Sequence, residues 1–144
     1  RNALSEHKLE EARVLLGCNH VLQGIVTQGD QRGRQLGFPT ANLYPSAGMM
    51  IPCGIYISTL RHNDRTWPAV TNVGVRPTFG EQQAPNAETH ALDQTDLDLY
   101  DRQIEVELHQ WLRAERKFSG IDALVEQITD DCTKARQWHS QGTH

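Results

Sequence analysis

The chain of 144 residues is poor in several features that mark large classes of protein. It has three cysteines, an odd and widely spaced set, which argues against a disulfide framework and against a paired metal-ligand spacing. Aromatic residues make up 6%, the net charge is −4 and no long Lys/Arg stripe is present, so we expect no nucleic-acid partner. No apolar run approaches the roughly 20 residues of a membrane span, so we expect no membrane partner. The odd, scattered cysteines favour a reducing, cytoplasmic location.

The length and the 38% hydrophobic composition fit one compact domain with a real core. Apolar residues at helical spacing predict a helix over about residues 2–16, with Gly17 as its stop. Arg1 leads directly into this helical pattern, so we expect the chain to be a piece of a longer protein.

From Val21 onward the sequence changes to short β-rich runs separated by turn residues. The predicted strands are 21–26, 40–43, 54–60, 66–74, 88–93 and 103–112. In the last of them Ile104, Val106 and Leu108 alternate with polar residues, which predicts one buried and one wet face. Six strands with no helices between them favour an antiparallel barrel or sandwich, and we prefer a small closed barrel.

A helix is predicted to close the chain and to pack on the outside of the barrel. Ser119 and Asp122 resemble a capping box at its start. Its predicted apolar stripe consists of Ile121, Leu124, Val125, Ile128, Cys132, Ala135 and Trp138.

A glycine-rich loop, "GDQRGRQLGFP", precedes the second predicted strand. Gly29, Gly33 and Gly37 allow positive φ and close approach of a ligand, and Arg34 adds positive charge. The loop lacks the Gly-Lys-Ser/Thr ending of a Walker A motif. From spacing alone it is either an anion-binding loop or, more often for such sequences, a wide hairpin turn.

The residues that follow this loop carry hard oxygen atoms. Pro39 fixes the backbone before Thr40 and Asn42, whose side chains share one face of a strand. Their neutral oxygens suit Mg²⁺ only when phosphate oxygens share the ion. A buried structural pair of polar residues is an equally good interpretation.

Three further residues are candidates for a site. Glu88 begins a predicted strand after the polar loop "GEQQAPNA" and is either a general base for an alcohol or an exposed edge residue. His90 shares its face, either to orient that carboxylate or, more commonly, as a wall residue. Arg76 is a candidate ligand contact.

In combination, several segments resemble a known family. They are "GRQLGFPTANL", "IPCGIYI", "TNVGVRPTF", "ETHALD", "DLYDRQIEVELHQWLRAERKF" and "DALVEQITDD", in this order. They resemble the riboflavin kinase module, which forms the C-terminal half of bacterial bifunctional riboflavin kinase/FAD synthetases. The first eighteen residues resemble the helical stretch that follows the adenylyltransferase domain of those proteins.

The resemblance implies a mainly β fold, a six-stranded antiparallel Greek-key barrel with a C-terminal helix and an N-terminal helical segment. It divides the chain into a helical linker (1–18) and a kinase domain (19–144), with an FMN adenylyltransferase domain as partner in the full-length protein. It also implies transfer of the ATP γ-phosphate to the 5′-hydroxyl of riboflavin, giving FMN and ADP, and no FAD synthesis by this chain alone.

The resemblance also implies roles for individual residues. Thr40 and Asn42 match residues that bind Mg²⁺ with the nucleotide, and Glu88 matches the catalytic base. The nucleotide flap matches Gly29–Pro39, which includes Phe38, and "LRAERKF" with the last helix matches part of the flavin side. Asp101 departs from the family, which usually has glycine there, so the turn is expected to differ.

A non-catalytic flavin- or nucleotide-binding module is the alternative function. The presence of Glu88 together with Thr40 and Asn42 argues against it, because a binding module needs no base.

Overall fold

The computed structural model describes residues 20–27, 37–44, 51–77, 83–94 and 98–141, with side chains omitted at 75–77 and 83–85. The predicted N-terminal helix lies outside these ranges. No helix among the described residues combines the length and the apolar character needed to cross a bilayer.

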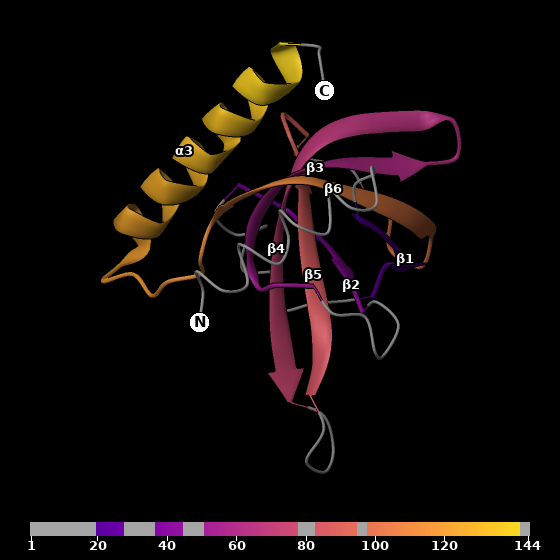
Figure 1. Ribbon diagram of the computed structural model, residues 1–144, viewed down its shortest axis with the longest axis horizontal. Coiled ribbons are helices and arrows are strands. Elements are labelled where there is room, and N and C mark those ends of the chain that lie inside the picture. Colours follow the sequence, from indigo (N-terminus) through magenta and orange to yellow (C-terminus); the bar gives the residue numbers. More distant parts are fainter. Residues whose placement is uncertain (1–19, 28–36, 45–50, 78–82, 95–97, 142–144) are drawn as a thin grey trace.

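Six antiparallel strands and one helix make up the described fold (Figure 1). The strands are β1 (His20–Ile25), β2 (Ala41–Leu43), β3 (Gly54–His62), β4 (Arg65–Pro77), β5 (Gln83–Ala91) and β6 (Gln103–Arg113), and the helix is α3 (Ile121–Ser140). They form one sheet in the order β1-β6-β3-β4-β5-β2. Three consecutive hairpin-linked strands, β3 to β5, with β6 returning beside β3, make a Greek key, as the family resemblance implied.

The sheet curls so that its two edges meet. The edge contact is an isolated antiparallel bridge in which the Thr27 amide donates to the Asn42 carbonyl at 2.8 Å. The inner face holds the main core, with Leu22, Tyr56 and Val106 fully buried. Burial of such apolar faces is the main stabilising contribution in a domain of this size.

The outer face of β3 changes character along its length, because alternate residues point outward. Ile55 lines a cavity, and Ile57 lies in a second apolar cluster with Cys132 and Ala135 of α3. Beyond it, Arg61 lies among polar residues of β6. The outer face of this one strand thus contributes to a cavity, to the contact surface of α3 and to a polar surface.

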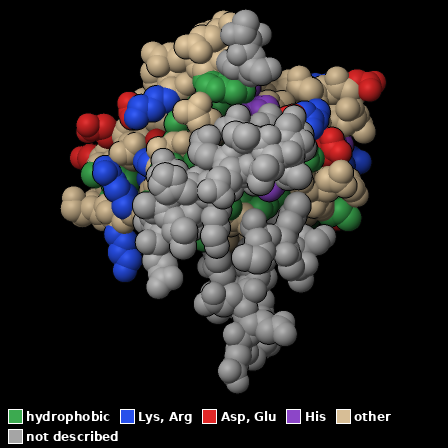
Figure 2. Space-filling model, viewed as in Figure 1, with side chains coloured by type: hydrophobic (Ala, Val, Ile, Leu, Met, Phe, Trp, Pro, Cys, Tyr) green, Lys and Arg blue, Asp and Glu red, His purple; other side chains and the backbone are tan. Residues whose placement is uncertain are grey.

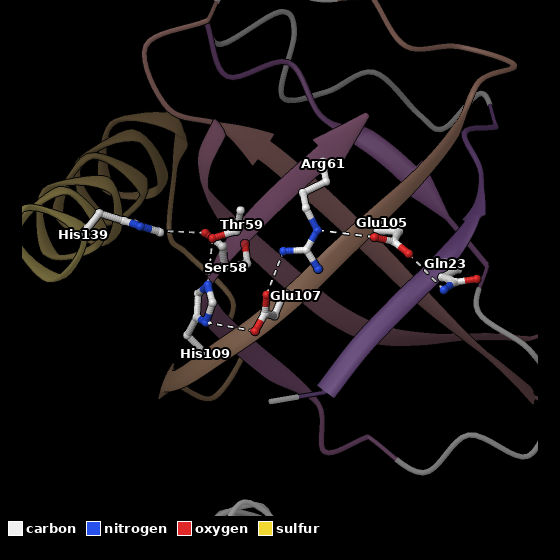
Figure 3. Close-up of polar contacts among 8 residues, drawn as sticks. All are labelled: Gln23, Ser58, Thr59, Arg61, Glu105, Glu107, His109 and His139. Carbon is white, nitrogen blue, oxygen red and sulfur yellow. Dashed lines mark hydrogen bonds and ion pairs between the residues drawn. The ribbon is translucent and has the colours of Figure 1, made fainter. Parts of the chain in front are cut away.

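That polar surface is a connected set of hydrogen bonds and ion pairs, which we call the β3–β6 network (Figure 3). Arg61 donates to Glu105 at 3.3 Å and to Glu107 at 2.7 Å. His109 shares a 2.7 Å hydrogen bond with Thr59. The remaining members are Gln23, which donates to Glu105, and His139, which donates to the Ser58 carbonyl.

The structure corrects four details of the sequence interpretation. β5 begins at Gln83, so much of "GEQQAPNA" is strand and not loop, because β4 extends to Pro77 and supplies its hydrogen-bonding partner. The cap of α3 is Gly120 with no side-chain cap, and not the predicted capping box. Ile121 is 65% exposed, so it lies outside the buried stripe. His109 is buried and not wet, since Trp138 stacks on it at 4.6 Å.

The turn before β6 accommodates Asp101, the residue that departs from the resembled family. Its φ is +67°, in the left-handed region that glycine enters freely and aspartate tolerates. The Asp101 amide donates to the Val26 carbonyl and the Arg102 amide to that of Leu99, both at 2.9 Å. The turn therefore forms without glycine at this position.

Candidate active site

A cavity of about 840 Å³ lies between the outer face of the sheet and α3 with the segment before it. Its floor comes from β3, β4 and β5 and its wall from residues 113–120 and from α3. The floor residues are Ile55, Val70, Asn72, Glu88 and His90. Phe38 and Thr40 line the same cavity from the segment that leads into β2.

One row of register partners crosses five strands at this place and sets the order of side chains in the floor. The row runs from Asn42 on β2 through Glu88 on β5, Asn72 on β4 and Ile55 on β3 to Arg113 on β6. Directly opposed residues in antiparallel strands point to the same face. The row therefore begins with three polar side chains, continues with the apolar Ile55 and ends with the charged Arg113.

Glu88 lies well inside β5, sixth of nine residues, and not at the strand entrance that the sequence predicted. Its side chain is half-buried and lines the cavity with Thr40. A carboxylate in the floor of a cavity, beside a hydroxyl-bearing segment, is placed to accept a proton from a bound alcohol.

Thr40 and Asn42 differ in their surroundings although they share a face. Thr40 is exposed in the cavity, whereas Asn42 is 2% exposed. The Asn42 amide donates to Thr27 Oγ1 at 3.0 Å, and its Oδ1 accepts from Asn86 at 2.7 Å. Asn42 Oδ1 keeps a second lone pair, but of the two residues only Thr40 is among those that line the cavity.

His90 connects β5 to the segment before Thr40. Its Nδ1–H donates to the Pro39 carbonyl at 2.9 Å, and its ring meets Phe38 edge-on at 5.5 Å. Burial lowers the pKa of His90 below its ordinary value, so the neutral ring is favoured. His90 is therefore a lining residue of the cavity whose ring is already engaged, which corresponds to the commoner of the two predicted roles, and it contacts both Phe38 and Pro39.

The opposite wall is held by an ion pair. Arg113 donates to both carboxylate oxygens of Asp131, at 3.0 and 2.7 Å, and Asp131 is 3% exposed. Arg116 and Lys117 add positive charge to this wall. Figure 2 shows basic and acidic side chains intermingled along the side of the molecule occupied by α3 and the segment before it. Sequence reasoning missed Asp131; its only signal is a carboxylate next to Cys132 in an apolar stripe.

Several predicted residues lie outside what the structure describes. Gly29, Gly33 and Arg34 fall in the range 28–36, and the side chain of Arg76 is among those omitted. Gly37 is described and has a φ of +89°, which favours glycine there.

Comparison with known proteins assigns the family. A family model for riboflavin kinase (Flavokinase) matches residues 16–139, most of the chain. The chain belongs to the riboflavin kinase family. Within this family it is 38% identical over 143 residues to a bifunctional riboflavin kinase/FMN adenylyltransferase of Bacillus subtilis. That match covers 97% of the chain but 45% of the relative, so the chain spans less than half of the relative's length.

Two solved structures support the fold of this riboflavin kinase family member. The crystal structure of riboflavin kinase from Trypanosoma brucei matches with a TM-score of 0.61 at 21% identity, covering 85% of this chain and 80% of that one. That of a macrolide-efflux protein from Streptococcus pneumoniae matches with a TM-score of 0.80 at 30% identity, covering 90% and 42%. The mainly β architecture with one C-terminal helix, expected from the sequence, is confirmed.

Proposed function

We propose that the chain transfers the γ-phosphoryl group of ATP to the 5′-hydroxyl of riboflavin, giving FMN and ADP. The observation that carries the proposal is the meeting of Glu88 and Thr40 in one cavity of a chain that belongs to the riboflavin kinase family. Thr40 comes from the segment before β2 and Glu88 from β5, so the fold itself brings the two groups together.

In this proposal the isoalloxazine ring lies against the apolar part of the cavity, and the 5′-hydroxyl reaches Glu88. Ile55 and Val70 supply the apolar floor, with Leu124 and Ile128 of α3 facing them. Glu88 accepts the hydroxyl proton as the oxygen attacks phosphorus, a contribution of roughly 10²–10⁴-fold for a positioned base. The remaining requirement of phosphoryl transfer is positioning and neutralisation of charge.

Neutral oxygen donors at this site would suit Mg²⁺ when phosphates share the ion. Thr40 Oγ1 and Asn42 Oδ1 would hold the ion from the protein side, and the neutral pair leaves the remaining positions to ATP oxygens and water. When bound, the ion would offset negative charge on the transferred group. The glycine loop Gly29–Pro39, with Arg34, is proposed to cover the nucleotide, and Arg76 to contact a ligand.

The length of the bifunctional relative supports the proposal that this reaction belongs to a larger protein. Because this relative is bifunctional and more than twice as long as the match, we propose that an FMN adenylyltransferase domain accompanies the kinase domain, with residues 1–18 as a helical linker. Adenylyl transfer would then belong to that other domain. The proposed location of the whole is the cytoplasm.

The test is formation of FMN from riboflavin, ATP and Mg²⁺, followed by chromatography. Glu88→Gln is expected to lower kcat by roughly 10²–10⁴-fold while the affinity for ATP changes little. The matched control is Glu126→Gln, an exposed position of α3 outside the cavity, which is expected to keep parental activity. Saturable riboflavin binding without FMN would instead support the sensor function, and full activity of Glu88→Gln would remove this residue from the mechanism.

A further inference from the structure

One buried polar atom in the floor of the cavity has no partner among the described residues. The atom is Oδ1 of Asn72, the half-buried residue of β4 that lines the cavity between Glu88 and Ile55. Buried acceptors almost always receive a hydrogen bond, because an unmet one retains the full cost of its desolvation. An unmet acceptor in a ligand cavity therefore indicates a donor that arrives with the ligand.

The contrast with other buried polar residues of the sheet supports this interpretation. Thr71, next to Asn72 but facing the inner side, shares 2.8 Å hydrogen bonds with both Ser58 and Thr89. Asn86, two residues from Glu88, donates to Asn42 Oδ1. Asn72 is the exception among these residues, and it is the one that lines the cavity.

The row of register partners shows which part of a ligand would reach Asn72. On one side of it lies Glu88, the proposed acceptor of the proton from the reacting hydroxyl. On the other side lies Ile55, part of the apolar floor proposed for the ring. Neighbouring strands are about 4.8 Å apart, a distance that a few carbon atoms span. The part of riboflavin between the ring and the reacting hydroxyl is the polyol chain.

We infer that Asn72 Oδ1 accepts a hydrogen bond from an internal hydroxyl of the ribityl chain, and that Asn72 selects flavins with a hydroxylated chain. The inference rests on the proposed kinase function, for which it names a specificity-determining residue. An amide oxygen can only accept, and a hydroxyl of the substrate brings the proton that the unliganded site lacks. A substrate without this hydroxyl leaves the acceptor buried and unmet, which disfavours it on the order of ten- to a hundred-fold.

The test compares two substrates and four proteins. The substrates are riboflavin and a flavin whose side chain is 5-hydroxypentyl, which keeps the terminal hydroxyl and lacks the internal ones. The proteins are the parent, Asn72→Leu, Asn72→Ala and Ile55→Val. Asn72→Leu keeps the approximate shape without the acceptor, and Asn72→Ala cannot overfill the site. Ile55→Val is the matched control, since it trims the adjacent residue of the same row without changing polarity.

We expect the parent to prefer riboflavin by about ten- to a hundred-fold in kcat/KM. Both Asn72 variants should lose at least about tenfold of this preference, because kcat/KM falls for riboflavin and stays within about threefold for the analogue. Ile55→Val should lower kcat/KM for both substrates by a similar factor. An equal fall for both substrates in the Asn72 variants, or an unchanged preference, would overturn the inference.

Stability gives a second, independent measurement. Replacing a buried unmet acceptor with an apolar group of similar shape should raise the Tm of the unliganded chain, by about 2–4 °C for Asn72→Leu. An asparagine with a purely structural role would give a lower Tm on this change, which would contradict the inference. If the parent phosphorylates neither flavin, the proposed function fails. In that case the Kd values of both flavins, measured by quenching of flavin fluorescence, test the inference separately. Loss of the preference for riboflavin in the Asn72 variants would support it, and an unchanged preference would overturn it.

Discussion

The β3–β6 network and the cavity lie on the same outer face of the sheet. They differ in whether the polar side chains there have hydrogen-bonding partners. In the network Arg61 is paired with two glutamates, and His109 is paired with Thr59 and covered by Trp138. In the cavity Thr40 is exposed and Asn72 Oδ1 has no partner among the described residues. Polar groups that satisfy one another stabilise the fold, whereas a group left open is available to a ligand.

The largest change in stability is expected at Asp131, because both of its carboxylate oxygens are paired with Arg113 in the wall of the cavity. Asp131→Asn should lower the free energy of unfolding by about 2–3 kcal/mol, since it leaves Arg113 without its charged partner in a largely buried place. Chemical denaturation measures the change. The control is Asp130→Asn, whose exposed ion pair with Lys134 should contribute about 0.5 kcal/mol or less. Equal effects at the two positions would show that burial of the pair is unimportant.

A smaller effect is expected in the network, because its ion pairs are partly exposed to solvent. Arg61→Met keeps the aliphatic stem and removes both ion pairs, so stability should fall by about 0.5–1 kcal/mol. The rate of FMN formation should stay within about twofold of the parent, because Arg61 lies outside the cavity. A large loss of activity with unchanged stability would contradict the division between the two regions. The exposed Arg102 offers a control for the same substitution.

The smallest effect concerns pH and His90 in the cavity. Its pKa in the folded chain is lowered, chiefly by burial, so the unfolded chain takes up the proton first as pH falls below about 6.5. Its contribution to stability is therefore present at neutral pH and is lost on acidification. In His90→Asn an amide N–H can still donate to Pro39, and the loss of stability as the pH falls below about 6.5 should be smaller. Parallel pH–stability curves for parent and variant would contradict this.

The sequence predicted the parts of the structure that rest on local periodicity. Alternation around Val106 predicted β6 with its buried face, and the apolar stripe predicted the closing helix. The helix start was wrong because Gly120 takes the cap position without a side-chain bond. The start of β5 was wrong because its partner strand runs on to Pro77, a pairing that local composition does not encode.

The candidate site was predictable in part. Glu88 and Thr40 carry chemistry that is visible in the sequence, and the structure places both in one cavity. Asn72 was missed because its importance depends on an unmet hydrogen bond, which appears only when all neighbours are in place. Asp131 was missed because its partner Arg113 lies on another element. The roles of Thr40, Asn42 and Glu88 remain predictions.

The position of α3 has a consequence for local opening of the molecule. Leu124, Ile128 and Asp131 give the helix a place in the wall of the cavity, while Cys132 and Ala135 seat it on the sheet. Detachment of the helix would therefore open the cavity and, in the same event, expose the apolar surface of the sheet that Cys132 and Ala135 cover. A flavin that fills the cavity would bind the attached form alone, and hydrogen exchange of the α3 backbone amides should slow in proportion to its occupancy.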